Sequence, residues 1–110
     1  MSIATPPTAK RPEDCQTMAQ VRAGIDTLDR DLVALLDRRF AYMRAAARIK
    51  PEREQVRDEA RKAAVITAAQ AEAERLGAPA ERIAGLWEML VESSIAYEFE
   101  QWDAQGWTSP

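Results

Sequence analysis

Apolar residues recur at alternating steps of three and four in the first half of the chain, which is the spacing of one face of an α-helix. These residues are Met18, Val21, Ile25, Leu28, Leu32 and Leu35, and the pattern continues through Arg39, Tyr42 or Met43 and Ala46 to Ile49. Thr17 and Gln20 have the spacing of a capping box, and Pro51 disfavours helical backbone at the residue before it. The pattern predicts one long helix from about Thr17 to about Ile49, which Gly24 weakens without ending.

Two shorter helical segments follow a polar loop at residues 51–55. We predict a helix over about 56–76, because Gly77 suits its C-terminal cap and Pro79 suits the first turn of the next helix. The next helix is predicted over about 80–104. The inner faces comprise Val65, Ala68 or Ala69, Ala73 and Leu76 in the first segment, and Ile83, Leu86 or Trp87, Leu90, Ser94 and Tyr97 or Glu98 in the second.

These elements predict an all-α fold with three helices per chain: one helical domain at residues 17–104, a flexible N-terminal arm at 1–16 and a frayed tail at 105–110. At ~1.5 Å per residue, the helices span roughly 50, 30 and 37 Å. Neither shorter helix can cover the whole seam of the long one, and a seam with this period favours a partner helix. We therefore expect an intertwined homodimer; a monomeric bundle with a bent first helix is the alternative.

Composition excludes several kinds of chemistry. The chain has no His and a single Cys, Cys15, so it can form no internal disulfide, no His–Cys zinc site and no Ser–His or Cys–His nucleophile. No carboxylate cluster suggests Mg²⁺, and we predict neither metal nor cofactor. The net charge of −3 and the acidic residues between the arginines argue against nucleic-acid binding. No segment resembles a signal peptide or a membrane helix, which makes the cytoplasm the default location.

Each inner face changes from apolar to polar near one end. The polar positions are Arg39 and Lys50 on the long helix, Asp58 and Arg61 on the second, and Ser94 and Glu98 on the third. Buried charges are costly unless they are paired, so three cations on inner faces indicate an anionic ligand.

Each of these residues also has an ordinary structural explanation. Arg39 can extend to the surface or pair with a nearby carboxylate, and Lys50 suits a helix C-terminus, where the dipole favours cations. Asp58 suits a helix start, and Ser94 on a helix needs no special role. The coincidence of all of them on inner faces favours a binding site.

An ordered set of motifs carries a resemblance to a known family: PEDC near the start, VRAGIDTLDRDLVALLDRR, the lysine that closes ARIK, then VRDEAR and ESSIAYE. Over roughly residues 12–103 the chain resembles the all-helical chorismate mutase family, including its branch of isochorismate-pyruvate lyases. The PEDC opening is most similar to the lyase branch and its close mutase relatives. The resemblance implies an intertwined homodimer with two equivalent active sites that bind a dicarboxylate without a cofactor.

The resemblance implies that arginines hold the substrate. Arg39 and Arg61 resemble the arginines that bind its carboxylates, and Arg22 resembles the arginine that one protomer donates to its partner's site. Arg22 lies 17 residues before Arg39, roughly 25 Å along one helix. Both can hold one small molecule only when Arg22 comes from the other chain, which an antiparallel pairing of the long helices would allow.

Other positions match the family pattern in part. Lys50 resembles the lysine that contacts the ether oxygen and a carboxylate, and Glu98 stands where many members have Gln and some have Glu. Asp58 matches a position near the ring hydroxyl, and Ser94 matches a ligand-contacting position. Lys62 replaces a Glu of many mutases, and the loop after Lys50 is one residue short, two departures that affect how the hydroxyl is bound.

The activity implied is the pericyclic rearrangement of chorismate to prephenate. Catalysis would come from holding a compact conformer and stabilising negative charge on the ether oxygen, for which Lys50, Glu98 and Arg39 are the candidates. Asp58 favours this reaction, whereas PEDC favours the isochorismate-pyruvate lyase reaction. A non-catalytic helical dimerisation or regulatory module is the alternative of another class, but it leaves the inward cations unexplained.

Overall fold

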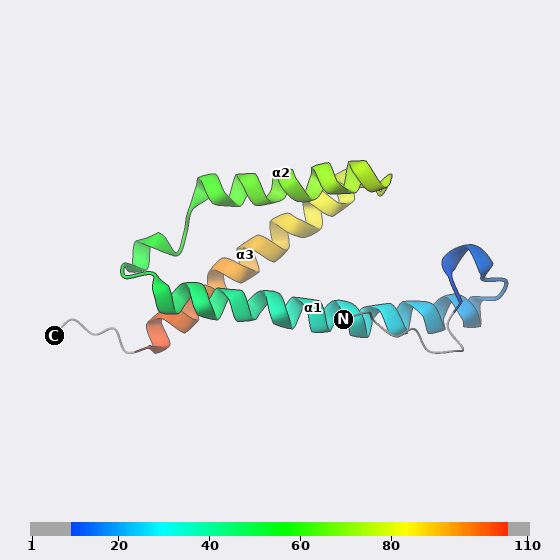
Figure 1. The fold of residues 1–110 in the computed structure, drawn as a ribbon, viewed down its shortest axis with the longest axis horizontal. Helices are drawn as coiled ribbons and strands as arrows, with labels where there is room; N and C mark the ends of the chain where they lie inside the picture. Colours follow the sequence, from blue (N-terminus) through cyan, green and yellow to red (C-terminus); the bar gives the residue numbers. More distant parts are fainter. Residues whose placement is uncertain (1–9, 106–110) are drawn as a thin grey trace. The chain divides into compact units, whose positions relative to one another are not determined.

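The computed structural model describes residues 10–105, and every regular element in that range is a helix. The α-helices are α1 (Met18–Ile49), α2 (Glu59–Leu76) and α3 (Ala80–Ala104), with single 3₁₀ turns η1 (Pro12–Asp14) and η2 (Arg53–Gln55) (Figure 1). The predicted all-α class, with one long and two shorter helices, is confirmed. Residues 1–9 of the predicted arm and residues 106–110 of the predicted tail lie outside the described residues.

The chain divides into two compact units, one ending at Arg39 and the other beginning at Phe40. In the first, the predicted capping box is present. The Gln20 N–H donates to Thr17 Oγ1 at 3.2 Å, and the Gln20 side chain accepts from the Thr17 N–H at 3.3 Å. These bonds satisfy amide groups that the first helical turn leaves unpaired. Helix α1 then continues through Gly24, as predicted.

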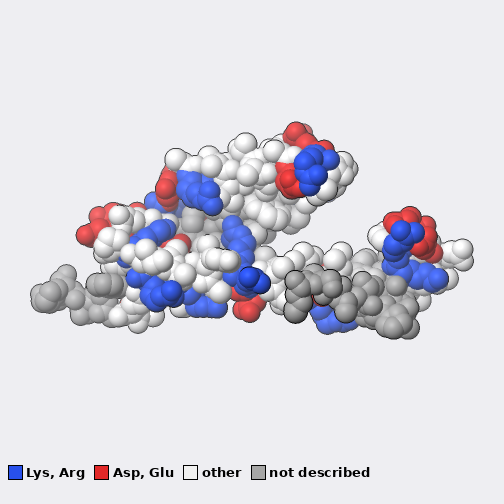
Figure 2. Space-filling view, viewed as in Figure 1, with Lys and Arg blue, Asp and Glu red and all other residues white. Residues whose placement is uncertain are grey.

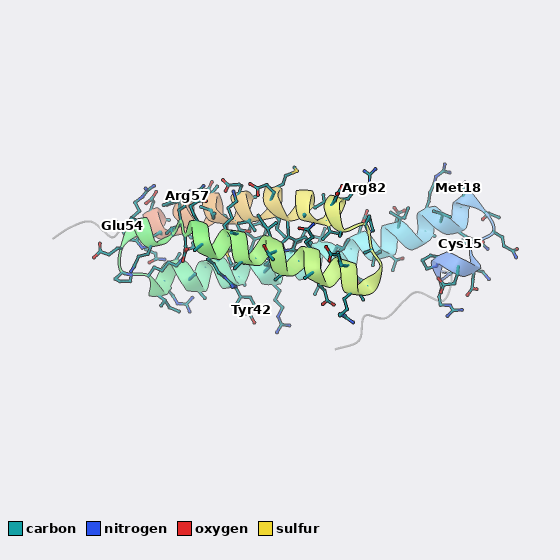
Figure 3. The ribbon with its side chains drawn as sticks, turned by 90° about the horizontal axis from the view of Figure 1, so that it is seen from above. Cys15, Met18, Tyr42, Glu54, Arg57 and Arg82 are labelled. Carbon is teal, nitrogen blue, oxygen red and sulfur yellow. The ribbon has the colours of Figure 1, made fainter. Side chains whose placement is uncertain are left out.

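The predicted seam of α1 is open to solvent along the first unit. Its large apolar side chains are between 47% and 58% exposed, namely Met18, Ile25, Leu28, Leu32 and Leu35. Met18 stands at the start of this row, beside the turn that carries Cys15 (Figure 3). Contiguous apolar surface of this kind marks an interaction face in a soluble protein.

The second unit packs α2 and α3 against each other. Gly77 ends α2 in the left-handed conformation, with φ 71°, and the Ala78 N–H donates to the Ala73 carbonyl at 2.8 Å. This cap reverses the chain, and Pro79 directly precedes α3. Side chains of both helices meet along the seam between them (Figure 3). The apolar core comprises Val56, Val91 and Ile95, with Val65, Ile66, Trp87, Phe99 and Trp102 packed around them.

The second predicted helix begins later than expected. Residues 53–55 form η2, in which the Glu52 and Gln55 side chains form a capping box, so Val56 belongs to the connection and is buried in the core. Helix α2 starts at Glu59, where Asp58 caps it. The predicted inner residue Leu76 is wrong, since it is 65% exposed; of the alternatives Leu86 and Trp87, Trp87 packs against the core and Leu86 is 58% exposed.

Among residues 10–105, none of the helices combines the length and the apolar character needed to cross a bilayer. In the same range, no three Cys, Asp or Glu side chains come together in a way that suits a metal ion.

Candidate active site

Lys50 and Glu98, predicted on inner faces of different helices, form an ion pair. Lys50 follows the last residue of α1, and its N–H still donates to the Ala46 carbonyl at 2.9 Å. Its Nζ lies 2.7 Å from Glu98 Oε2 on α3. The Glu98 side chain is 5% exposed and that of Lys50 30%. Loss of Lys50 would leave an almost fully buried carboxylate without its cation, so the pair stabilises the placement of both side chains.

Ser94 lies one turn before Glu98 on α3 and is buried as well. Its Oγ donates to the Leu90 carbonyl at 2.7 Å, the common intrahelical bond of a helical serine. Ser94 and Glu98 therefore form a short polar strip on a face of α3 whose other buried residues, Val91 and Ile95, are apolar.

Asp58 and Arg61 lie at the first turn of α2, and both residues are exposed in the single chain. Asp58 Oδ1 accepts the Arg61 backbone N–H at 3.0 Å, which is the ordinary N-cap interaction. The Arg61 guanidinium makes no hydrogen bond or ion pair with any residue between 10 and 105. Asp58 thus has a structural role whatever it binds, and Arg61 presents a cation that no carboxylate of the described chain neutralises.

Arg22 and Arg39 belong to the first unit. Arg22 is exposed on α1, while Arg39 is partly buried and has an interaction of its own. Their roles in substrate binding stay predictions, as do those of the residues in the second unit.

Basic side chains gather over the end of α1 and the start of α2 in the view of Figure 2. Acidic side chains lie among them, so this face is not uniformly positive.

Comparison with known proteins assigns the chain to a family. Residues 21–99 match the protein family described as chorismate mutase type II. The chain belongs to the type II chorismate mutase family. It is also 34% identical over 93 residues to the isochorismate pyruvate lyase of Pseudomonas aeruginosa, an alignment that covers 84% of this chain and 92% of that protein. The predicted resemblance, lyase branch included, is confirmed.

Lys62 stands where many chorismate mutases have a Glu. In this structure its ammonium group forms two ion pairs with α3. Lys62 Nζ lies 2.6 Å from Glu88 and 2.8 Å from Glu92, both on α3. Arg57 bonds Glu92 through two nitrogens at 2.9 and 3.1 Å, and it also bonds Glu59 at 2.9 Å. Arg57 lies where the chain enters α2 (Figure 3). These contacts tie the start of α2 to α3.

These ion pairs also shift the pKa values of Glu92 and Lys62. Hydrogen bonds from Arg57 first and Lys62 second lower the pKa of Glu92 to about 2, from an ordinary 4.5. Glu88 and then Glu92 raise the pKa of Lys62. The Lys62 charge is therefore balanced by two carboxylates. We interpret Lys62 as a structural cation.

The Glu92→Gln variant is expected to lose an acid-dependent part of the stability. A carboxylate whose pKa is lower in the folded state stabilises the fold fully above its unfolded pKa, here near 4.5, and progressively less as the pH falls toward 2. The difference in unfolding free energy between wild type and variant should be constant from pH 7 to about 5 and then narrow. Urea unfolding at a series of pH values measures it.

Glu100→Gln is the matched control, because Glu100 is an exposed glutamate of α3 without an ion pair to residues 10–105. The unfolding free energy of Glu100→Gln should stay close to that of wild type at every pH in the series. A difference for Glu92→Gln that does not change between pH 7 and pH 2.5 would contradict the assigned pKa.

Three contacts hold the last part of α1 against α3 near Glu98. The Phe40 and Tyr97 rings meet edge to face, with centroids 5.1 Å apart. Arg44 donates to the Tyr97 hydroxyl at 2.9 Å, and Trp102 Nε1 donates to the Lys50 carbonyl at 3.0 Å. Tyr97 was one of the candidates for the inner face of its helix, but the bonds that Arg44 and Lys50 make here were not predicted. The bond from Trp102 could have been anticipated, because Trp102 lies one helical turn after Glu98 and therefore on the same face of α3.

Proposed function

We propose that the protein is a chorismate mutase, which rearranges chorismate to prephenate at a site built around Lys50 and Glu98. The observation that carries this proposal is the 2.7 Å pair between the Lys50 ammonium and a carboxylate that is 5% exposed. The Glu98 carboxylate is almost fully shielded from water, whereas the Lys50 side chain is 30% exposed, so the ammonium is held in place and stays accessible to a ligand. Membership of the chorismate mutase family supports the choice of ligand.

The substrate carries two carboxylates, and the pair of Lys50 with Glu98 has no net charge. Further cations must therefore bind the substrate. Arg61 is suited to one carboxylate because its guanidinium is exposed and has no partner among the described residues. Arg39 and Arg22 are proposed for the same task, since a guanidinium matches a carboxylate with two parallel hydrogen bonds.

The reaction is intramolecular: the ether C–O bond breaks while a new C–C bond forms, and no atom enters or leaves. Two tasks remain for the protein, to hold the reactive conformer and to stabilise the negative charge that grows on the ether oxygen. We assign the second task to Lys50. Glu98 can assist only as a protonated donor, because a carboxylate accepts hydrogen bonds and repels the developing charge.

The open seam of α1 supports the intertwined homodimer. Its exposed residues repeat at the spacing of a helix–helix interface, and pairing two copies of this seam would bury them. In that dimer the partner chain would supply Arg22. A site formed by two chains is consistent with the exposure of Arg61 and Asp58 in one chain.

Isochorismate-pyruvate lyase is the second candidate, and two observations favour it. The curated relative has that name, and Asp58, which had favoured the mutase, is accounted for as an N-cap. The lyase reaction also breaks the bond to the ether oxygen, so the same cations would serve it. A non-catalytic dimerisation module does not explain a buried glutamate paired with a partly buried lysine in a chain of this enzyme family.

Product analysis separates these activities. The purified protein is incubated with chorismate and with isochorismate in separate reactions, and prephenate, salicylate and pyruvate are quantified. We expect prephenate from chorismate, far above a parallel reaction with the Lys50→Met variant, which corrects for the uncatalysed rearrangement. Salicylate and pyruvate from isochorismate, without prephenate from chorismate, would establish the lyase instead. Conversion of neither substrate would show that the proposed function is wrong.

A further inference from the structure

The backbone of Lys50 is held as well as its ammonium group. The last carbonyls of a helix have no partner within it, and Pro51 directly after Lys50 has no N–H with which to begin a turn. Trp102 supplies a donor from outside the helix: its Nε1 lies 3.0 Å from the Lys50 carbonyl oxygen, in a partly buried contact.

Two residues on one face of α3 therefore bind Lys50, one through its side-chain ammonium and the other through its backbone carbonyl. Glu98 bonds the Nζ atom at 2.7 Å, and one turn later Trp102 bonds the carbonyl. Trp102 is itself fixed, because it packs against the buried cluster that includes Val91 and Ile95. Motion of the end of α1 relative to α3 is opposed at two points on this residue.

A neighbouring contact is a weaker candidate for the same task. Arg53 bonds Asp103 at 2.9 and 3.1 Å and lies over the Phe99 ring, 4.5 Å from its centroid. Both charged side chains of that pair are about half exposed, and exposed ion pairs contribute little to order or stability. The Trp102 hydrogen bond is partly buried, and it is made to the backbone carbonyl of Lys50 itself.

We propose that Trp102 is a positioning residue, whose indole N–H fixes the end of α1 so that the Lys50 ammonium stays aligned with the breaking ether bond. This inference rests on the proposed function. Trp102 touches neither the substrate nor the reacting atoms; it acts through Lys50. Small displacements of a catalytic charge cost much rate and little binding, because charge stabilisation is needed mainly in the transition state.

Replacement of Trp102 by Phe keeps an aromatic ring in the cluster and removes the donor. We expect kcat for the active substrate to fall roughly tenfold to a hundredfold, with KM changed less than about threefold. Trp87→Phe is the matched control: Trp87 lies on the same helix and in the same cluster, and it has no hydrogen bond to residues 10–105. Its kcat should stay near that of wild type.

A second measurement uses the unaltered protein. In ¹H–¹⁵N NMR spectra, with the indole signals assigned from the two variants, the Trp102 N–H should exchange with solvent more slowly than the Trp87 N–H. Equal exchange rates would overturn the inference, and so would kcat values that fall alike in the two variants. A parallel loss of kcat, substrate affinity and thermal stability in Trp102→Phe would indicate a purely structural role. If wild type converts neither chorismate nor isochorismate, the proposed function fails first, and this inference fails with it.

Discussion

The Lys50→Met variant is expected to lose roughly two to three orders of magnitude in kcat, with a much smaller change in KM. Its ammonium is assigned to the ether oxygen, where negative charge appears as the C–O bond breaks, so its contribution is made mainly in the transition state. Methionine keeps most of the apolar stem of lysine and removes the charge. Initial rates over a range of substrate concentrations, taken well below the unfolding temperature of the variant, separate kcat from KM.

Lys62→Met is the matched control for this experiment. Like Lys50, Lys62 is a partly buried lysine whose Nζ lies within 3 Å of glutamates on α3, and at 17% its side chain is even less exposed than that of Lys50. Its charge is balanced by Glu88 and Glu92, so we expect a loss of stability but a kcat within roughly threefold of wild type. Equal losses of kcat in the two variants, or a near-normal kcat for Lys50→Met, would remove Lys50 from the proposed catalytic role.

The helices could be predicted from the sequence because the signals that delimit them are local. Thr17 and Gln20 form a capping box, and Gly77 has the positive φ that a C-terminal cap needs. The pairing of Lys50 with Glu98 could also be predicted from the sequence. Each continues an apolar stripe on its own helix, and two charges that interrupt apolar faces have a strong reason to meet.

Other contacts depend on the rotation and the register of one helix against another, which a repeat of three to four residues does not specify. Arg57 meets Glu92 across 35 residues, and Trp102 meets Lys50 across 52. Helix α2 is rich in alanine, so its inner face has little contrast with its outer face, and Leu76 was placed on the wrong side. Burial of Val56 could not be inferred from a helical pattern because Val56 lies before the helix.

Mixing Arg22→Ala chains with Lys50→Met chains is expected to produce activity that neither variant has alone. If Arg22 acts in trans, each site combines Arg22 of one protomer with Lys50 of the other. In a mixed dimer, one site then carries both substitutions and the other carries neither. The exposed seam of α1 and the 17-residue separation of Arg22 from Arg39 both support this arrangement. Loss of a charged contact to a substrate carboxylate costs about 2–5 kcal/mol, so each parent variant should have very low activity.

Joint unfolding and refolding of equal amounts of the two variants gives mixed dimers for half of the population. Because each mixed dimer has one intact site of two, the mixture should recover roughly a quarter of the wild-type activity. Arg61→Ala mixed with Lys50→Met is the control, since both residues belong to the same unit of one chain and every site retains one defect. Recovery in the first mixture and none in the second would establish Arg22 as a residue donated between protomers. Equal failure of both mixtures would place Arg22 in the site of its own chain or outside any site.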